Sequence, residues 1–207
     1  MSLKNHSYYL ANRFGKFFGR IFKTNNSIYW HEILNRFYSS YKSSQFKKVG
    51  KNIYIKYPMH LIGGENIELG DNFICLQRLR IETYNNSVGK EYTPQLIIGN
   101  NVGINMDCHI GCINKIVIGN NVLISSKVFI TDHFHGNTKD LSLAPNQRKL
   151  ESKGAVIIED NVWIGENVAI MPNVTIGKNC IIGANSIVTK SFPANAVIAG
   201  NPARVVG

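Results

Sequence analysis

The C-terminal half of the chain repeats one pattern of apolar and polar residues every six positions. An aliphatic side chain returns at Ile158, Ile164, Ile170, Ile176, Ile182 and Val188. A second set of mostly apolar or small residues lies four positions after each of these: Val162, Val168, Val174, Cys180, Ser186 and Phe192. Neither a helical period nor strict strand alternation fits this spacing. Short strands separated by turns do fit it, with one hexapeptide on each side of a triangular coil.

The same period occurs upstream, with interruptions. Residues 98–110 follow it, a two-residue slip comes next, residues 118–130 resume it, and residues 69–81 hold a fainter copy. Asparagine precedes the second apolar position in four hexapeptides, at residues 161, 167, 173 and 179. Because asparagine tolerates left-handed backbone, we expect corners of the coil there.

Between Ile130 and Ile158 the period is lost in a polar segment that contains glycine and proline. A loop this long in a compact solenoid is typically functional or disordered. We therefore expect an excursion around residues 131–155 that leaves the coil and returns to the same stack.

The first 48 residues differ from the rest in charge. They hold nine lysines and arginines against one acid, Glu32, in a chain of 207 residues with a formal net charge of +10. Aromatic residues recur at helical spacing among these cations. The sequence thus predicts a basic, aromatic helical appendage over residues 1–48 and a β-helix domain over residues 49–207. The appendage fits two roles, peripheral contact with an anionic bilayer or a cap on the open end of the coil. No nucleic acid is expected, because no recognised binding motif accompanies the charge.

The cysteines and the hydropathy pattern lead to two expectations, one on the core and one on location. Cys75, Cys108, Cys112 and Cys180 form no CxxC pair and are expected to be small buried residues. There is no secretory signal, and no apolar run long enough to span a membrane. The expected location is the cytoplasm, or the inner face of the cytoplasmic membrane.

Two stretches carry a family resemblance. The run NVWIGENVAIMPNVTIGKNCIIGANSIVTK, with AGNPARVV after it, resembles the hexapeptide-repeat acyltransferases of the maltose/galactoside O-acetyltransferase group. DHFHGN with QRKLESKG is similar to the polysaccharide branch of that group, the O-antigen and capsule O-acetyltransferases. The resemblance covers roughly residues 50–207. It implies an all-β fold, a left-handed parallel β-helix, in a homotrimer with active sites between subunits. It also implies transfer of acetyl from acetyl-CoA to a sugar hydroxyl, on a free sugar or a lipid-linked saccharide.

His133 and His135 are the candidate catalytic residues. A hydroxyl that attacks a thioester needs a base to take its proton, and imidazole suits that role. In the resembling enzymes the catalytic histidine follows the last inward aliphatic residue by five positions, which from Ile130 gives His135. His133 is the competitor, and two solvated loop histidines are the structural alternative. Asp132 and Glu151 are both candidates for orienting an imidazole.

The resemblance alone assigns the other site residues: the substrate contacts Asn105 and Trp163, and the coenzyme A contacts Ala184, Thr189, Lys190 and Arg204. The first two coenzyme A contacts would lie along pantetheine, and the two cations would meet phosphates. Glu166 stands where the galactoside enzymes have a serine, which puts that donor contact in doubt. Asn105 is equally readable as a structural corner residue.

Competing functions remain open at this stage. His109, His133 and His135 suggest a zinc set, but their spacing departs from the zinc-binding relatives of this fold, so no metal is expected. No cysteine or serine near the histidines has the context of a nucleophile, which favours direct transfer without an acyl-enzyme. The alternatives are N-acetylation of a nucleotide-linked amino sugar, and a non-enzymatic membrane-attached scaffold whose histidine loop only makes subunit contacts.

Overall fold

The computed structural model describes residues 3–21, 24–136 and 142–207, which fall into two compact units, Met1–Phe37 and Tyr38–Gly207. The division comes earlier than the 48/49 boundary that composition indicates, because side chains late in helix α2 (Thr24–Ser43) bond to the first coil. Ser39 Oγ accepts the Ile55 N–H at 2.7 Å and donates to the Ile55 carbonyl at 3.0 Å. The Tyr38 hydroxyl bonds the main chain of Met59 in the same way, at 3.0 and 3.2 Å.

The first unit is helical, as the sequence predicts. Helix α1 (Leu3–Ile21) carries exposed apolar side chains at Leu10, Phe14, Phe17 and Phe18. Their spacing of four, seven and eight residues places them on one face of the helix. Among the described residues, no helix is long and apolar enough to cross a membrane.

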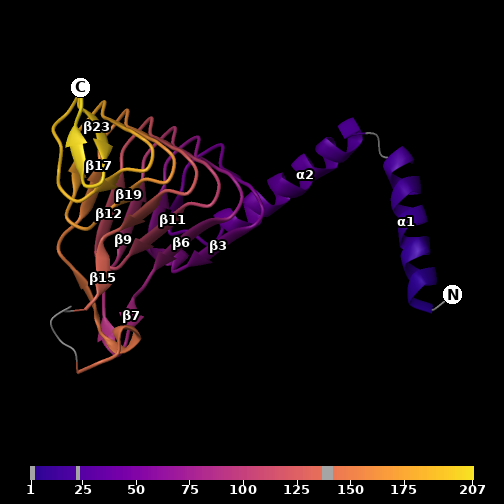
Figure 1. Cartoon of the computed structure of the whole chain (residues 1–207), viewed down its shortest axis with the longest axis horizontal. Coiled ribbons are helices and arrows are strands. Elements are labelled where there is room, and N and C mark those ends of the chain that lie inside the picture. The colour runs from indigo at the N-terminus through magenta and orange to yellow at the C-terminus, as the bar shows by residue number, and fades with distance from the viewer. Residues whose placement is uncertain (1–2, 22–23, 137–141) are drawn as a thin grey trace. The chain divides into compact units, whose positions relative to one another are not determined.

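The second unit is a coil of three parallel sheets, and this confirms the predicted left-handed parallel β-helix (Figure 1). The first sheet has six strands: β1 (Lys48–Val49), β4 (Ile67–Leu69), β9 (Gln95–Ile98), β12 (Lys115–Ile118), β17 (Val156–Ile158) and β20 (Thr175–Ile176). The second has eight: β2 (Tyr54–Ile55), β5 (Ile74–Cys75), β10 (Gly103–Ile104), β13 (Leu123–Ile124), β18 (Trp163–Ile164), β21 (Ile181–Ile182), β23 (Val197–Gly200) and the antiparallel β24 (Ala203–Val205). The third runs β22 (Ile187–Val188), β19 (Ala169–Ile170), β14 (Phe129–Thr131), β11 (His109–Cys112), β6 (Leu79–Thr83) and β3 (Met59–Ile62).

The hexapeptide period is the period of the core. All six aliphatic residues from Ile158 to Val188 are at most 1% exposed, and all four cysteines are buried. Each coil therefore stacks its aliphatic side chains directly on those of its neighbours, which removes the apolar surface from water at roughly 25 cal/mol per Å².

One corner of the coil is built from a ladder of asparagines in left-handed backbone. Its members have φ between 55° and 63°: Asn52, Asn72, Asn101, Asn121, Asn161, Asn179 and Asn195. Each side-chain amide donates to the next side-chain carbonyl at 2.8–3.1 Å. The corner positions expected at 161, 167, 173 and 179 all have positive φ, which confirms that asparagine marks the turns.

Two excursions leave the coil at the same corner, between the third sheet and the first (Figure 1). The expected one contains β15 (His133–His135), which pairs antiparallel with β16 (Leu150–Ser152). The other is a hairpin of β7 (Asn86–Ser87) and β8 (Lys90–Glu91), which sequence analysis missed. Its two turn residues, Val88 and Gly89, have φ of 50° and 68°. The glycine is a turn signal, but a β-branched residue rarely adopts left-handed backbone, and this obscured the hairpin. Two short 3-10 turns, Gly64–Asn66 and Pro145–Gln147, complete the described elements.

Candidate active site

A cavity of about 360 Å³ opens on the outer face of the third sheet, where the two excursions meet it. Its floor comes from strands β6, β11 and β14, and its walls come from the β7–β8 hairpin and from the β15–β16 excursion. The lining residues are Arg80, Glu82, Tyr84, Ser87, His109, Gly111, Phe129, Thr131, His133, Phe134, His135 and Leu150. Both candidate histidines thus share one cavity, as their spacing suggests.

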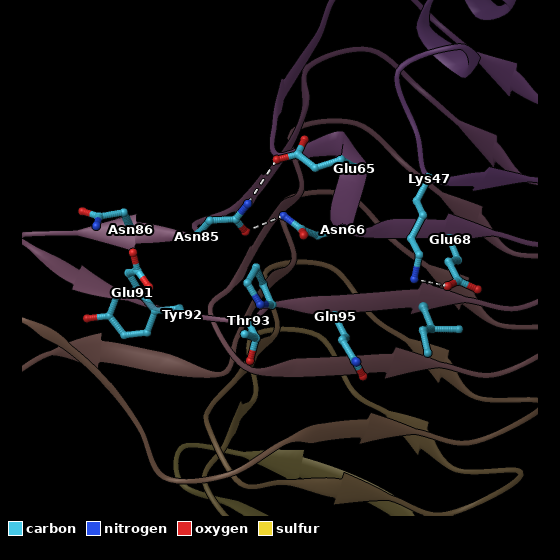
Figure 2. Close-up of a pocket in the computed structure, with 12 residues that line it drawn as sticks. Lys47, Glu65, Asn66, Glu68, Asn85, Asn86, Glu91, Tyr92, Thr93 and Gln95 are labelled. Carbon is cyan, nitrogen blue, oxygen red and sulfur yellow. Dashed lines mark hydrogen bonds and ion pairs between the residues drawn. The ribbon is translucent and has the colours of Figure 1, made fainter.

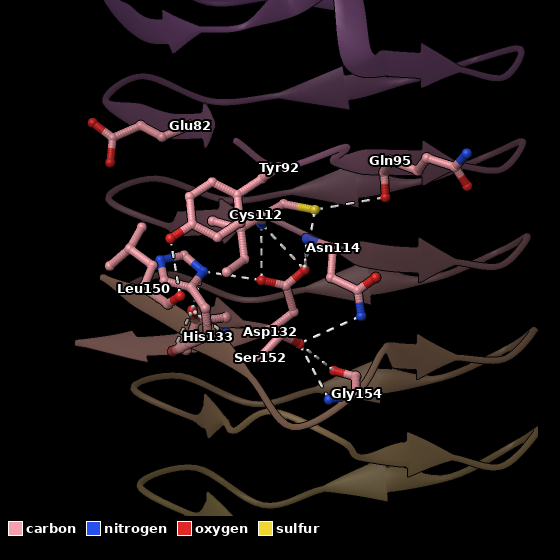
Figure 3. A network of polar contacts seen from close by, with 12 residues as sticks. Glu82, Tyr92, Gln95, Cys112, Asn114, Asp132, His133, Leu150, Ser152 and Gly154 are labelled. Carbon is pink, nitrogen blue, oxygen red and sulfur yellow. Dashed lines mark hydrogen bonds and ion pairs between the residues drawn. The ribbon is translucent and has the colours of Figure 1, made fainter. Parts of the chain in front are cut away.

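His133 is held by a buried carboxylate. Its Nδ1 lies 2.9 Å from Oδ1 of Asp132, whose side chain is fully buried (Figure 3). The same carboxylate accepts main-chain N–H groups from the neighbouring coil, Ile113 at 3.0 Å and Asn114 at 2.8 Å, and the thiol of Cys112 at 3.3 Å. The backbone of one coil therefore fixes the group that orients the imidazole of the next.

These contacts determine which imidazole nitrogen is basic. Burial alone would raise the pKa of the Asp132 carboxyl, but the hydrogen bonds from His133, Ile113 and Asn114 outweigh it and hold that pKa below its usual range. An ionised carboxylate can only accept, so Nδ1 of His133 carries the proton. In the neutral imidazole the lone pair is then on Nε2, and the side chain is only 12% exposed.

Gly111 makes room for the imidazole. A Cβ at this position would stand 3.2 Å from Cε1 of His133 and 3.8 Å from Nε2 of His109. At 3.2 Å the Cβ would be closer than ordinary van der Waals contact, so the His133 ring would have to move. The absence of a side chain in the middle of β11 lets the His133 ring lie close to the sheet.

A second charged group forms the far side of the cavity. The Glu82 carboxylate is 5% exposed and lies 2.8 Å from Nη2 of Arg80, 3.2 Å from Nε2 of His109 and 3.1 Å from Nε2 of His60. Burial raises the pKa of this carboxyl, but hydrogen bonds from Arg80 and Tyr84 prevail and lower it to about 2. Burial, followed by the Arg80 charge, lowers the pKa of His109. The sequence around 80–84 reads as an ordinary strand surface, so no local signal pointed to this cluster.

The residues proposed for orientation and catalysis differ in their surroundings. Asp132 contacts His133, whereas Glu151 is exposed and stands opposite Phe134 in the β15–β16 pair. His135 is also exposed and stands opposite Leu150. The geometry therefore favours His133 as the oriented imidazole, which reverses the order that the five-residue spacing suggests.

The other predicted site residues lie outside this cavity. Asn105 is half-buried at the corner after β10 and donates its main-chain N–H to Ile124 at 2.8 Å. Trp163 is 50% exposed, and its indole N–H donates to Ser125 Oγ at 3.4 Å. The remaining four are exposed residues of the last coils: Ala184, Thr189, Lys190 and Arg204. Over the described part of the chain, no group of three or more His, Cys, Asp or Glu residues is arranged to hold a metal ion.

Comparison with known proteins agrees with this architecture. The family model described as bacterial transferase hexapeptide (six repeats) matches residues 155–190. WbbJ of Escherichia coli (strain K12), which bears the name of a lipopolysaccharide biosynthesis O-acetyl transferase, is 39% identical over 158 residues, 73% of this chain and 76% of that protein. Galactoside O-acetyltransferase of the same organism is 33% identical over 166 residues, 78% of this chain and 63% of that protein.

Solved structures show the same fold. The N-acyltransferase AntD from Bacillus cereus, solved with coenzyme A and dTDP-4-amino-4,6-dideoxyglucose, superposes with a TM-score of 0.67 at 21% identity, over 81% of this chain and 86% of that one. A maltose O-acetyltransferase from Clostridium difficile 630 gives a TM-score of 0.53 at 33% identity, over 79% of this chain and 70% of that one. The identity and coverage of the WbbJ match, together with the repeat and its fold, place the chain in the hexapeptide-repeat transferase family, among its acetyltransferases.

Proposed function

We propose that the protein transfers acetyl from acetyl-CoA to a sugar hydroxyl during surface-polysaccharide biosynthesis, with His133 as the general base. The observation that carries this proposal is the Asp132–His133 pair, which presents a basic Nε2 in a cavity lined by both charged and aromatic residues. The names of the O-acetyltransferase relatives support the reaction class and the polysaccharide setting.

The reaction is a direct transfer. Nε2 of His133 takes the hydroxyl proton as the sugar oxygen attacks the thioester carbonyl, and a tetrahedral intermediate forms. Its collapse breaks the carbon–sulfur bond, and the imidazolium returns its proton to the coenzyme A thiolate. Ionised Asp132 stabilises the imidazolium between these two steps, and it remains ionised throughout.

An alternative acceptor keeps the same machinery. AntD is an N-acyltransferase whose structure holds an amino sugar on a nucleotide, so an amine is the second candidate nucleophile. An amine acceptor yields an amide and a hydroxyl yields an ester. Hydroxylamine cleaves the ester under mild conditions and leaves the amide intact, so it distinguishes the two products.

The residues for acetyl-CoA remain those that the family resemblance assigns. Lys190 and Arg204 are exposed cations near the C-terminal edge, which suits the phosphates of the nucleotide end. Ala184 and Thr189 are exposed beside them, where pantetheine would meet the main chain. Several structural neighbours were solved with coenzyme A or an acyl-CoA, which supports this donor.

A homotrimer is part of the proposal. The second sheet presents a column of exposed apolar side chains in register: Ile74, Leu123, Trp163, Ile181 and Val197, each between 38% and 50% exposed. Gly103 separates Ile74 from Leu123, and the other four side chains follow one another from strand to strand; exposed apolar surface of this kind is typical of an interaction site. A second copy of the chain that packed on this column would contact Trp163, one of the predicted substrate contacts.

Peripheral membrane contact through α1 is the last part of the proposal. Phe14, Phe17 and Phe18 share an exposed face, and Arg13 and Lys16 are exposed beside it. Such a helix binds an anionic bilayer through its apolar face and its cations. Co-sedimentation with phosphatidylglycerol vesicles, but not with phosphatidylcholine vesicles, is expected for the wild type and lost in a Phe14→Ser/Phe17→Ser variant. Equal sedimentation of the two proteins would refute the membrane role.

The test of the function is thiol release from acetyl-CoA with a panel of free, nucleotide-linked and lipid-linked sugars. Turnover by the wild type should fall about 10²–10⁴-fold in His133→Ala, the range for a general base, and far less in His135→Ala. A loss confined to His135→Ala would move the base and keep the function. If both variants are as active as the wild type, the histidine mechanism is wrong. Wild type without turnover and without coenzyme A binding would favour the scaffold.

A further inference from the structure

A second and larger cavity, of about 690 Å³, lies on the other side of the β7–β8 hairpin (Figure 2). It occupies the outer face of the first sheet, along β4 and β9. Adjacent hairpin residues divide between the two cavities, because Asn86 lines this one and Ser87 lines the histidine cavity. The hairpin is therefore a wall that the two cavities share.

The lining of this cavity has the chemistry of a saccharide site. It combines the carboxylates of Glu65 and Glu91, the amides of Asn86 and Gln95, and the ring of Tyr92. Carboxylates and amide carbonyls accept hydrogen bonds from hydroxyl groups, and amide N–H₂ groups donate to them. A mixed set of this kind matches a ligand that is rich in hydroxyl groups.

The charge of the lining narrows the ligand class. Among the lining residues, the ammonium group of Lys47 is engaged by Glu68 at 2.9 Å, and the carboxylates of Glu65 and Glu91 remain; Lys90 stands outside the lining, with its Nζ 5.3 Å from the Tyr92 ring centroid. Negative charge repels a nucleotide diphosphate or a uronic acid and accepts a neutral or amino sugar. The lining itself therefore favours a neutral or amino sugar over a diphosphate.

Tyr92 connects the cavity to the histidine site. Its side chain lines the second cavity, and its hydroxyl donates to the carbonyl oxygen of Leu150 at 3.0 Å. Leu150 lines the histidine cavity and stands opposite His135 in the β15–β16 pair. An acceptor longer than one sugar unit can therefore engage both cavities around one shared wall.

We infer that the second cavity is a distal saccharide subsite, which binds neutral or amino sugar units of an oligosaccharide acceptor while another unit is acetylated at His133. The inference rests on the proposed function and specifies its acceptor as a saccharide chain, free or lipid-linked, in preference to a nucleotide sugar. Asn86 and Glu91 are opposite each other in the hairpin, so their side chains share a face, and both line the second cavity.

The experiment compares mono-, di- and tetrasaccharides of galactose and of N-acetylglucosamine as acceptors for the wild type and for Asn86→Ala/Glu91→Gln. The expected KM of the wild type is lower for the tetrasaccharide than for the monosaccharide. The double variant should raise the tetrasaccharide KM about 10-fold or more, the worth of one or two charged hydrogen bonds, and leave the monosaccharide kcat and KM unchanged. Val88→Asn, at the tip of the same hairpin and outside both cavity linings, is the matched control and should behave as wild type.

Equal KM values for short and long acceptors in the wild type would overturn the subsite and leave the acetyltransferase proposal standing. A double variant that affects both acceptor lengths alike would also overturn it. Saturation-transfer NMR of the tetrasaccharides with His133→Ala gives a readout that needs no turnover. If the wild type acetylates no sugar, the proposed function fails. The subsite is still supported if the tetrasaccharides bind to His133→Ala in the NMR experiment and this binding is lost when the Asn86→Ala/Glu91→Gln background is added. Binding that is absent, or unchanged in that background, refutes it.

Discussion

Replacement of Asp132 by asparagine tests the geometry of the base with the smallest possible change in shape. Oδ1 of Asp132 accepts from Ile113 at 3.0 Å and from Nδ1 of His133 at 2.9 Å. Oδ2 accepts from Asn114 at 2.8 Å and from the Cys112 thiol at 3.3 Å, and it also lies 3.3 Å from the Ile113 nitrogen. The introduced amide must put its NH₂ group at one of these two positions, where every neighbour is a donor.

The two positions are not equivalent. An NH₂ group at the Oδ2 position would face the N–H of Asn114 at 2.8 Å and leave that buried donor unsatisfied. If the NH₂ group takes the Oδ1 position, the N–H of Ile113 can donate to the remaining oxygen instead. Nδ1 of His133 can then lose its proton and accept a hydrogen bond from the NH₂ group. The second arrangement loses less hydrogen bonding, so we expect it to prevail. It moves the imidazole proton to Nε2 and thereby removes the base.

The expected result is a loss in kcat of about 10²–10⁴-fold with an unchanged KM for acetyl-CoA, since general-base catalysis contributes that much. The free energy of unfolding should fall by about 1–3 kcal/mol, because one buried bond to a charged acceptor is weakened. Steady-state thiol release gives the first quantity, and urea denaturation followed by circular dichroism gives the second.

Asp160→Asn is the matched control. Its Oδ1 also accepts a main-chain N–H across coils, from Asn120 at 2.7 Å, but at a corner remote from the histidine cavity. It should lose some stability and keep its kcat. If Asp132→Asn keeps its kcat within about threefold of wild type, or if the control loses as much kcat, then Asp132 does not set the tautomer of His133.

Three further predictions follow from individual contacts. Gly111→Ala should lower kcat about 10- to 100-fold, because the new Cβ would stand 3.2 Å from Cε1 of His133 and displace the ring. A kcat near that of the wild type in thiol-release assays would show that the ring has room to shift. Asn121→Ala should lower the free energy of unfolding in urea by about 1–3 kcal/mol, because alanine is strained in left-handed backbone and two amide hydrogen bonds are lost. Asn121→Gly should lower it less, because glycine adopts this backbone without strain; equal losses in the two variants would exclude strain as a cause. Glu82→Gln should destabilise the protein by on the order of 3 kcal/mol at pH 7. The folded pKa of Glu82, about 2, lies below its ordinary 4.5, so this difference exists above pH 4.5 and should vanish as pH falls toward 2; thermal melts that differ equally at pH 7 and pH 2 would contradict it.

The coil could be predicted from sequence because its determinants are local and repeated. A residue such as Ile164 is buried on a neighbour that carries the same residue type, so the period itself encodes the stacking. Asparagine marks the corners for a similar reason, since one residue fixes one backbone conformation. The adjacency of Asp132 and His133 was also visible, although only the structure shows that the two side chains meet.

The rest of the site could not be predicted because its contacts join segments that no period relates. Tyr92 and Leu150 are 58 positions apart and meet only because both excursions leave at one corner. The β7–β8 hairpin interrupts the period between Ile81 and Ile98 and hides how residues 80–84 align with β11, so the meeting of Glu82 with His109 could not be foreseen. The five-residue count from Ile130 rested on the spacing in the resembling enzymes alone. Here the chain enters β15 directly, and it is the third residue after Ile130 that meets the buried carboxylate.

The way Asp132 is held explains how one fold can combine a fixed base with changeable acceptor contacts. Apart from His133 itself, the donors to its carboxylate are the main-chain groups of Ile113 and Asn114 and the thiol of Cys112, which belong to the preceding coil and to none of the excursions. The orientation of His133 therefore depends on the stacking of coils, which the apolar core enforces. The walls of both cavities come instead from the excursions, which are tied to one another by a few polar contacts such as Tyr92 to Leu150. Substitutions in the β7–β8 hairpin can alter which sugar reaches Nε2 without disturbing the proton at Nδ1, whereas β15 carries His133 itself. The coil thus anchors Asp132, which orients the base, while the β7–β8 hairpin is free to vary, so the determinants of acceptor choice are to be sought in the hairpin.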